Sequence, residues 1–253
     1  MKIKKALTFR ASSIGDCLMG KYFLENVHIK YPNARCAIVV GSHSAMIRDL
    51  LSAYPWLEVI EANRHNLSSV LRLLYSWRES DIVLTQYAGK ANGRFSLTSK
   101  FIARLLARRG GLAGFADTSL WNRYLYDAVI SFDRNTAPAE LERQALTRIK
   151  IPVAITVPTL SFLPRTSVFE RFRVEFGRYA IVHLFAGNTG RGLSPKNQHA
   201  LICALHERLP GTVLLLSGGK KDAGQAEEVA ADMPNVRTIA GETSLQDMME
   251  LIS

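Results

Sequence analysis

The stretch KKALTFRASSIGDCLMG, residues 4–20, decides the fold. A short apolar run is followed by two serines, a glycine and an aspartate, and then by a segment of helical period that continues to about Tyr31. This order predicts a strand, a turn and a helix. In an open α/β sheet such a turn lies at the carboxyl end of a strand, where ligands bind. The stretch therefore predicts the first βα unit of a parallel sheet, with a polar turn placed to meet a ligand.

The same alternation continues along both halves of the chain, which predicts βαβ units throughout. Strands are expected at KKALTF, CAIVV, LEVI, DIVLT, GLAGF and DAVISF, and later at YAIVHLF, TVLLLSGG and NVRTIAG. Helices are expected near Ala45–Ala53, Leu67–Trp77, Pro195–Leu209 and Asp222–Asp232, and from Leu245 onward. Between the halves, IPVAITVPTLSFLP contains three prolines and is expected to be a linker. We therefore place one domain at 1–160 and a second at 161–253.

Composition and charge narrow the class of protein. The chain has 253 residues, of which 47% are hydrophobic, and no apolar run is long enough to span a membrane. The apolar run near the amino terminus breaks after a few residues, so we expect no secretory signal. Its three widely spaced cysteines lie in apolar segments and suit a reducing compartment, so we expect a cytoplasmic protein with buried thiols.

The positive charge is confined to the first half. Residues 1–150 carry 22 Lys and Arg against 12 Asp and Glu, whereas residues 151–253 carry 10 of each. Such a field attracts an anionic partner: a nucleic acid, a phosphorylated glycolipid or the anionic face of a membrane. A basic surface that serves only solubility explains the charge equally well.

The polar turn has two readings. Gly15 would let a ligand approach the backbone, the hydroxyls of Ser12 and Ser13 can donate hydrogen bonds, and free N–H groups at a helix start attract anions. Alternatively, Ser13 or Asp16 caps the helix, which the spacing alone favours. The turn is not a dinucleotide fingerprint, because it contains no G-x-G-x-x-G pattern.

An ordered set of motifs carries a resemblance to a known family. SSIGD is followed by an apolar helix that ends in YPNA, and then come ARRGGLAGF, VHLFAGNTGRGLSPKN, LLLSGGKKDAGQAEEV and IAGETSLQDMMELI. Together they cover essentially the whole chain, which resembles the bacterial ADP-heptose:lipopolysaccharide heptosyltransferases of glycosyltransferase family 9. The resemblance implies an α/β protein of the GT-B fold, with two Rossmann-like domains facing across a cleft. The first would bind the acceptor, and the second the donor nucleotide.

The resemblance also implies catalytic roles. Asp16 would be the general base that takes a proton from an acceptor hydroxyl as its oxygen attacks the anomeric carbon, so that the configuration inverts. Arg191 would neutralise the departing diphosphate. The backbone cradle around it would be formed by Gly187, Asn188 and Thr189. Acceptor contacts are expected at Ser12, Ser13 and Gly15.

Metal chemistry is not expected. A cation at Arg191 removes the need for a divalent ion, and the sequence has no Asp-x-Asp pair to hold one under a diphosphate. The six histidines and three cysteines show no His-x-x-x-His or Cys-x-x-Cys spacing. We predict no metal and no cofactor, with an ADP-sugar as donor substrate.

Two later loops are candidate donor contacts. Gly218 and Gly219 either make a tight turn or lie beside the donor nucleotide, with Asp222 near the ribose. The loop at Gly241–Leu245, which includes Thr243 and Ser244, would place backbone groups against adenine.

A basic helix is the remaining feature. In SKFIARLLARRG, a stripe of Lys100, Arg104 and Arg108 adjoins an apolar face of Phe101, Ile102, Leu105 and Leu106. The stripe is either a solvated surface or, with Lys90 and Arg94 before it, a contact for phosphate groups of a lipid A-type acceptor or of the membrane. We place Lys100 and Arg104 among the acceptor contacts.

The chain departs from the family pattern in three places. It reads His183-Leu184-Phe185 where members often have His-Pro-Gly, and Leu193-Ser194 where they have Trp-Pro. The family's Asp-Thr-Gly-x-x-His segment would lie beyond Ser253. Because the last helix has no glycine cap and only three strands are expected in the second domain, we expect the chain to lack a C-terminal portion and, without it, to bind ADP-sugar poorly.

The preferred interpretation is an inverting glycosyltransferase that moves a heptose or related sugar from an ADP-sugar to a lipopolysaccharide core, peripheral on the cytoplasmic face of the membrane. The alternative is a noncatalytic relative that binds a glycan or glycolipid. Nucleic-acid binding is a weaker third, since aromatic residues are not interleaved with the basic stripe.

Overall fold

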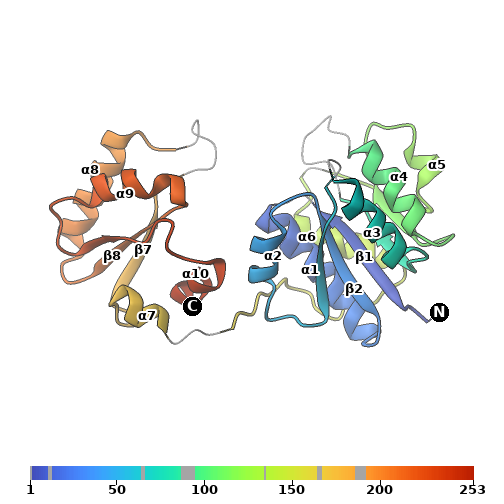
Figure 1. Ribbon diagram of the computed structural model, residues 1–253, viewed down its shortest axis with the longest axis horizontal. Coiled ribbons are helices and arrows are strands. Elements are labelled where there is room, and N and C mark those ends of the chain that lie inside the picture. Colours follow the sequence, from blue (N-terminus) through green and yellow to red (C-terminus); the bar gives the residue numbers. More distant parts are fainter. Residues whose placement is uncertain are drawn as a thin grey trace. The chain divides into compact units, whose positions relative to one another are not determined.

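The computed structural model describes residues 2–10, 13–63, 66–86, 95–133, 135–163, 167–185 and 192–253. The chain divides into two compact units, Met1–Ser161 and Phe162–Ser253 (Figure 1). The division falls one residue after the boundary expected from sequence. In the described ranges, no helix is both long and apolar enough to cross a membrane.

Unit 1 contains a six-stranded sheet with the order β3-β2-β1-β4-β5-β6, and all its neighbouring strands are parallel. Its strands are β1 (Lys5–Arg10), β2 (Arg35–Val40), β3 (Leu57–Glu61), β4 (Ile82–Leu84), β5 (Leu112–Phe115) and β6 (Ala128–Ile130). Each overlaps a strand predicted from the apolar runs. The chain direction across the sheet reverses between β1 and β4, which makes this the switch point where a doubly wound sheet binds ligands.

Six helices surround this sheet: α1 (Ile14–Lys30), α2 (Ser44–Leu50), α3 (Leu67–Trp77), α4 (Leu97–Leu106), α5 (Asn122–Leu125) and α6 (Pro138–Arg148). The bounds of α3 match the prediction. Helix α6 was not expected from sequence; it begins with Pro138 at a position where a proline costs no hydrogen bond.

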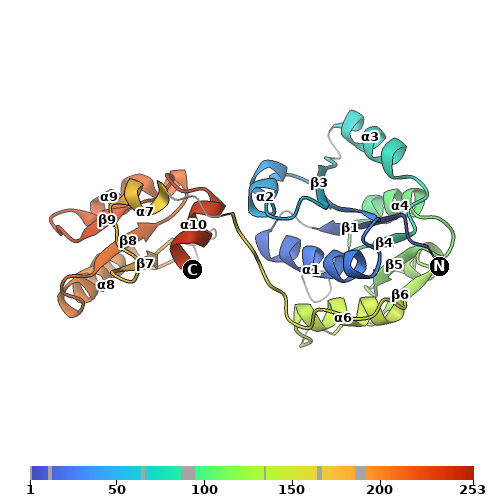
Figure 2. The same ribbon diagram turned by 90° about the horizontal axis from the view of Figure 1, so that it is seen from below.

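The two faces of the sheet meet different helices. Leu7 and Phe9 of β1 lie in one apolar cluster with side chains of α3 and α4, among them Leu73, Trp77, Ala103 and Leu106. The opposite face of β1 meets α1, which packs in turn against α6 (Figure 2). Here Gly20 is required, because a Cβ at this position would lie 2.8 Å from Arg10 Nε and 3.2 Å from Thr8 Cγ2.

Helix α1 is buried on most sides rather than amphipathic as expected. Its Asn26 Oδ1 accepts hydrogen bonds from the N–H groups of Ala154 and Ile155, at 2.7 and 2.9 Å, and Lys21 Nζ donates to the carbonyl of Thr159 at 2.8 Å. The first part of the expected linker is therefore irregular but bound along α1. This explains why it belongs to unit 1.

Unit 2 contains a three-stranded parallel sheet with the order β7-β8-β9. Its elements are α7 (Ser167–Phe172), β7 (Tyr179–His183), α8 (Pro195–Arg208), β8 (Val213–Ser217), the short 3₁₀ helix η2 (Lys220–Asp222), α9 (Ala223–Ala230), β9 (Val236–Thr238) and α10 (Leu245–Ile252). Leu214 and Leu216 of β8 pack with α8 and α9, whereas Leu215 packs with α7 and α10. Helices thus cover both faces, as in a Rossmann-like unit.

The three cysteines, all of them described residues, form no disulfide. Cys17 and Cys36 are buried as expected, but Cys203 is partly exposed on α8, with its Sγ 3.5 Å from His199 Nδ1.

Candidate functional site

Asp16 lies in the first turn of α1, directly after the strand at the switch point. Ser13 is the N-cap of the helix: its Oγ accepts a hydrogen bond from the N–H of Asp16 at 3.3 Å and donates one to Asp16 Oδ2 at 2.5 Å. Ser13 and Gly15 are exposed, and Asp16 is partly exposed. The capping reading therefore holds for Ser13. The carboxylate of Asp16 nevertheless stays accessible at the edge of the sheet where ligands bind.

A buried ion pair lies between β1 and α6, close enough to interact with Asp16. Arg10 Nη2 donates to Glu142 Oε2 at 2.7 Å, and the two side chains are 1% and 0% exposed. Among the described residues, Arg10 Nε, Arg10 Nη1 and Glu142 Oε1 have no hydrogen-bond partner. Burial raises the pKa of Glu142 to about 7; Arg10 opposes this shift and the charge of Asp16 adds to it. Glu142 and Asp16 are thus electrostatically coupled.

Sequence reasoning missed this pair because its members are 132 residues apart. The one available signal was Arg10 itself, a charged residue at the end of an apolar strand. Burial of an arginine requires a partner, and the sequence does not indicate which acidic residue provides it.

Lys100 lies elsewhere, and the expectation that it contacts an acceptor is wrong. It is fully buried on the inner side of α4, where its Nζ donates to Asp117 Oδ1 and Oδ2 at 2.9 and 2.8 Å and to Asn122 Oδ1 at 2.6 Å. Burial by itself would raise the pKa of Asp117, but hydrogen bonds from Lys100, Ser119 and Phe95 hold it below its ordinary value. All three donor hydrogens of Lys100 are used, so none remains for a ligand.

The side chain of Arg104 also forms its hydrogen bonds within unit 1. It donates to Asp127 Oδ2 at 2.7 Å and to the carbonyls of Ala107 and Arg108 at the end of α4, at 3.1 and 2.9 Å. The expected apolar face is also partly wrong, because Phe101 and Leu105 are exposed while Lys100 is buried. Helices α3 and α4 pack on the face of the sheet that Leu7 and Phe9 line, whereas α1 packs on the opposite face. Lys100 and Arg104 belong to α4, so the fold does not bring them to Asp16.

In unit 2, the loop after β8 is a tight turn. Gly218 accepts a backbone hydrogen bond from Gly241 at 2.9 Å, and a Cβ on Gly218 would lie 2.7 Å from the ring of Phe185. Asp222 Oδ2 accepts from the N–H of Gly219 at 2.9 Å. The loop therefore forms a tight turn that Asp222 stabilises, and the predicted contacts of Gly218, Gly219 and Asp222 with the donor nucleotide stay a prediction. The loops after β8 and β9 lie together at the carboxyl ends of both strands, which is the edge where a donor is expected.

Ser244 caps α10. Its Oγ accepts from the N–H of Asp247 at 3.1 Å, and its own N–H donates to Asp247 Oδ2 at 2.8 Å, a reciprocal capping box. Thr243 precedes it and is partly exposed. The predicted contact of this loop with adenine stays a prediction.

The remaining predicted contacts, Ser12, Gly187, Asn188, Thr189 and Arg191, lie outside the described residues, as do Lys90 and Arg94. The described residues on either side of positions 186–191 share one hydrogen-bond donor. Buried Gln198 donates from Nε2 to the carbonyls of Leu184 and Leu193, at 3.4 and 3.1 Å. Gln198 thus links the residues on both sides of the segment, a role that its position early in α8 did not indicate.

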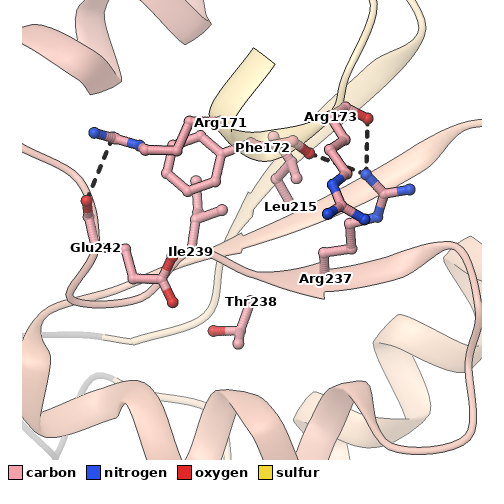
Figure 3. A pocket seen from close by; sticks show the side chains of 8 residues that line it. All are labelled: Arg171, Phe172, Arg173, Leu215, Arg237, Thr238, Ile239 and Glu242. Atoms are coloured by element: carbon pink, nitrogen blue, oxygen red, sulfur yellow. Dashed lines mark hydrogen bonds between the residues drawn. The ribbon is translucent and has the colours of Figure 1, made fainter. Parts of the chain in front are cut away.

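A cavity of about 310 Å³ lies between α7 and the sheet of unit 2 (Figure 3). Arg237 Nη1 donates across it to the carbonyls of Phe172 and Arg173 at 2.9 and 2.8 Å, and Arg171 Nη2 donates to that of Glu242 at 3.4 Å. Its lining includes none of the predicted donor contacts that lie within the described residues. Since two of its guanidinium groups already bind backbone carbonyls, we assign the cavity a structural role.

A metal centre is not evident in the described ranges of the chain, where no group of three or more His, Cys, Asp or Glu side chains could hold an ion.

Two successive Rossmann-like units, each with polar loops at the carboxyl ends of its strands, define the class: an α/β protein of the GT-B type, as predicted from sequence. Comparison with known proteins supports this class through structure alone, because neither a protein-family model nor a curated protein matches the chain.

Several solved structures of similar fold are glycosyltransferases. The chain is similar to the glycosyl transferase family 9 protein from Veillonella parvula, with a TM-score of 0.76 and 13% identity over 100% of this chain and 74% of that one. It is also similar to ADP-heptose lps heptosyltransferase II of E. coli, with a TM-score of 0.70 and 20% identity over 99% and 76%. A third is E. coli heptosyltransferase WaaC with ADP-2-deoxy-2-fluoro heptose, with a TM-score of 0.71 and 16% identity over 98% and 79%. The resemblance stated from the motifs is thus confirmed in the fold.

Proposed function

We propose that this chain is a glycosyltransferase that transfers a sugar from a nucleotide sugar to a glycan acceptor. The observation that carries the proposal is the position of Asp16. Its carboxylate is accessible in the first turn of α1, next to the switch point of a fold that the chain shares with sugar-nucleotide transferases. A carboxylate at this edge is suited to accept a proton from a hydroxyl within hydrogen-bond reach.

In the proposed reaction, the acceptor hydroxyl loses its proton to Asp16 as its oxygen attacks the anomeric carbon. The bond from that carbon to the diphosphate breaks on the opposite face, so the configuration inverts. The hydrogen bond from Ser13 holds the Asp16 carboxylate in one orientation. Arg191 is proposed to stabilise the charge of the departing diphosphate, without a metal ion.

The proposed donor is an ADP-sugar carrying a heptose or related sugar, and the proposed acceptor is a lipopolysaccharide core or a similar phosphorylated glycan. The names of the similar E. coli structures, which include ADP-heptose and an ADP-linked fluoro-heptose, support the donor. The net positive charge of residues 1–150 supports an anionic acceptor. Gly187, Asn188 and Thr189 with the loops at Gly218 and Thr243 are the proposed donor contacts.

The proposal is tested by incubating the chain with ADP-heptose and a heptose-free core oligosaccharide and identifying the products by mass spectrometry. We expect a product heavier by one heptose, an anomeric configuration opposite to that of the donor by NMR, and no loss of rate in EDTA. Binding of both the oligosaccharide and ADP-heptose without any transfer would instead support the noncatalytic alternative. A product of retained configuration would contradict the role given to Asp16.

A further inference from the structure

One surface of unit 1 has an unusual composition, and the proposed function does not account for it. Large apolar side chains on α4, on α5 and just before α5 are exposed: Leu97, Phe101, Leu105, Leu120, Trp121 and Tyr124. We call this set the α4–α5 face. Leu120 is 77% exposed, and Leu105 and Tyr124 are 66% and 65% exposed. Contiguous exposed apolar surface is rare on a soluble monomer and marks sites of interaction.

The residues of the α4–α5 face adjoin one another. The ring of Trp121 lies 5.7 Å from that of Phe101 and 6.3 Å from that of Tyr124, centroid to centroid. Leu97, Phe101 and Leu105 are four residues apart and therefore line one side of α4. Helix α4 turns Lys100, Ala103 and Leu106 inward, so this apolar side points away from the core.

Helix α3, which packs beside α4, extends the pattern (Figure 1). Its exposed apolar residues are again four apart: Leu67, Leu71 and Tyr75, with Tyr75 83% exposed. The helix buries Val70, Leu73 and Trp77 against the sheet. Helices α3 and α4 therefore each have an exposed apolar stripe in addition to the side that they bury against the sheet.

The helices at the α4–α5 face and the neighbouring α3 carry positive charge only. Helices α3, α4 and α5 contain no Asp or Glu. Arg109 and Arg123 are exposed at its edges, and the guanidinium of Arg123 lies 4.7 Å from the centroid of the Tyr124 ring. Three acidic residues nearby are already paired: Asp117 with Lys100, Asp127 with Arg104 and Asp81 with Arg108. An approaching surface therefore meets exposed leucines and aromatic rings bordered by positive charge.

We propose that the α4–α5 face docks on an anionic lipid bilayer. Leucine and phenylalanine side chains can enter the acyl boundary, while tryptophan and tyrosine favour the headgroup level. Each arginine near an anionic leaflet adds about 1 kcal/mol of attraction, which is about fivefold in binding. A second copy of this chain fits less well, because a symmetric contact would set the arginines of one face against those of the other.

The experiment is flotation of the full chain with vesicles of phosphatidylglycerol and phosphatidylcholine in equal parts, compared with vesicles of phosphatidylcholine alone. We expect binding to the anionic vesicles and a blue shift of tryptophan fluorescence that Trp121→Phe removes. The double variant L105Q/L120Q should bind about tenfold more weakly. Arg123→Gln should reduce binding about fivefold.

Matched variants elsewhere separate this face from general stickiness. V157Q removes an apolar side chain that is 66% exposed on unit 1 outside the face, and F176Q removes one that is 73% exposed on unit 2. Both should bind like the parent, as should Arg48→Gln. Equal loss in the control and face variants overturns the proposal, as does equal binding to both kinds of vesicle or to neither. A dimer in sedimentation that L105Q/L120Q dissociates would assign the face to a second copy and would also overturn it.

Discussion

Two ion pairs of unit 1, Arg10–Glu142 and Lys100–Asp117, have both side chains fully buried; they lie on opposite faces of the same sheet and differ in how fully their polar atoms are paired. Lys100 uses all three donor hydrogens on Asp117 and Asn122, and Asp117 also accepts from backbone N–H groups. Arg10 and Glu142 share one hydrogen bond and leave three buried polar atoms without a partner in the described chain.

This difference separates the Lys100–Asp117 pair, which stabilises the fold, from the Arg10–Glu142 pair, which lies near the candidate site. A fully paired buried charge fixes the packing of α4 and α5, and it has no capacity left for a ligand. A buried ion pair in which some polar atoms lack a hydrogen-bond partner lowers the free energy of unfolding. Buried groups in that condition occur near functional sites, and this pair is the one coupled to Asp16.

The largest effect is expected from Lys100→Met, which leaves Asp117 as a buried carboxylate without its cation. We expect the free energy of unfolding to fall by about 3–5 kcal/mol, measured by urea denaturation. Arg109→Met, at an exposed position near the end of the same helix, should change it by less than about 0.5 kcal/mol. If the two variants lose the same amount, Lys100 is not the anchor described here.

The second prediction concerns Glu142→Gln and pH. The pKa of Glu142 is raised from 4.5 to about 7, so the folded state binds a proton more tightly than the unfolded state, and the parent loses stability as pH rises between these values. Relative to the parent, the variant should gain roughly 2 kcal/mol from about pH 5 to 7 and no more above it.

Glu140→Gln on the same helix is the control, since Glu140 is only partly buried and pairs with Arg143 at the surface. Its difference from the parent should vary little over this range. If the difference in unfolding free energy between Glu142→Gln and the parent does not change with pH, burial does not raise the pKa of Glu142, and the contrast drawn between the two ion pairs is wrong.

The third prediction extends the comparison to an uncharged buried group in unit 2. Gln198→Ala leaves the carbonyls of Leu184 and Leu193 without their shared donor and should cost about 1–2 kcal/mol of unfolding free energy. If residues 187–191 contact the donor as proposed, the KM for the ADP-sugar should also rise. Gln225→Ala, which removes only the bond to Gln198 Oε1, should have the smaller effect on both.

The smallest effect on stability is expected from removing the serine N-cap of α1 or of α4. Ser13 and Ser96 each accept a backbone N–H at 3.3 Å, at the start of α1 and α4. Alanine at either position should lower the unfolding free energy by about 1 kcal/mol. Ser13→Ala should also reduce transfer, because Asp16 loses its partner, whereas Ser96→Ala should not. Equal rates for the two variants would remove Ser13 from the site.

The sequence predicted most of the fold because apolar runs and caps are local signals. Each predicted strand appears, and α3 matches its predicted bounds. The prediction for α4 was partly wrong: Leu106 is buried as the predicted apolar face requires, but Phe101 and Leu105 are exposed and Lys100 is buried. Asp117, 17 residues further on, provides the partner that makes burial of Lys100 favourable. Such a pairing depends on tertiary structure, which no local pattern contains.

For the site, the sequence identified the turn with Asp16 and the loops after the strands of unit 2. It did not show that Asp222 and Ser244 would satisfy backbone groups in their own loops. It also missed Arg10, Glu142 and Gln198. These three act through partners on other elements, so their positions within their own helix or strand carried no sign of their role.

The account depends most on Asp16 as the base, and the direct measurement is the transfer rate of Asp16→Asn from ADP-heptose to the core oligosaccharide. The amide keeps the shape and the contact with Ser13 but cannot take the proton, so we predict a fall in kcat of about 10²–10⁴-fold, with the affinity for ADP-heptose unchanged by calorimetry. A variant that folds normally and transfers at the parent rate would contradict the account.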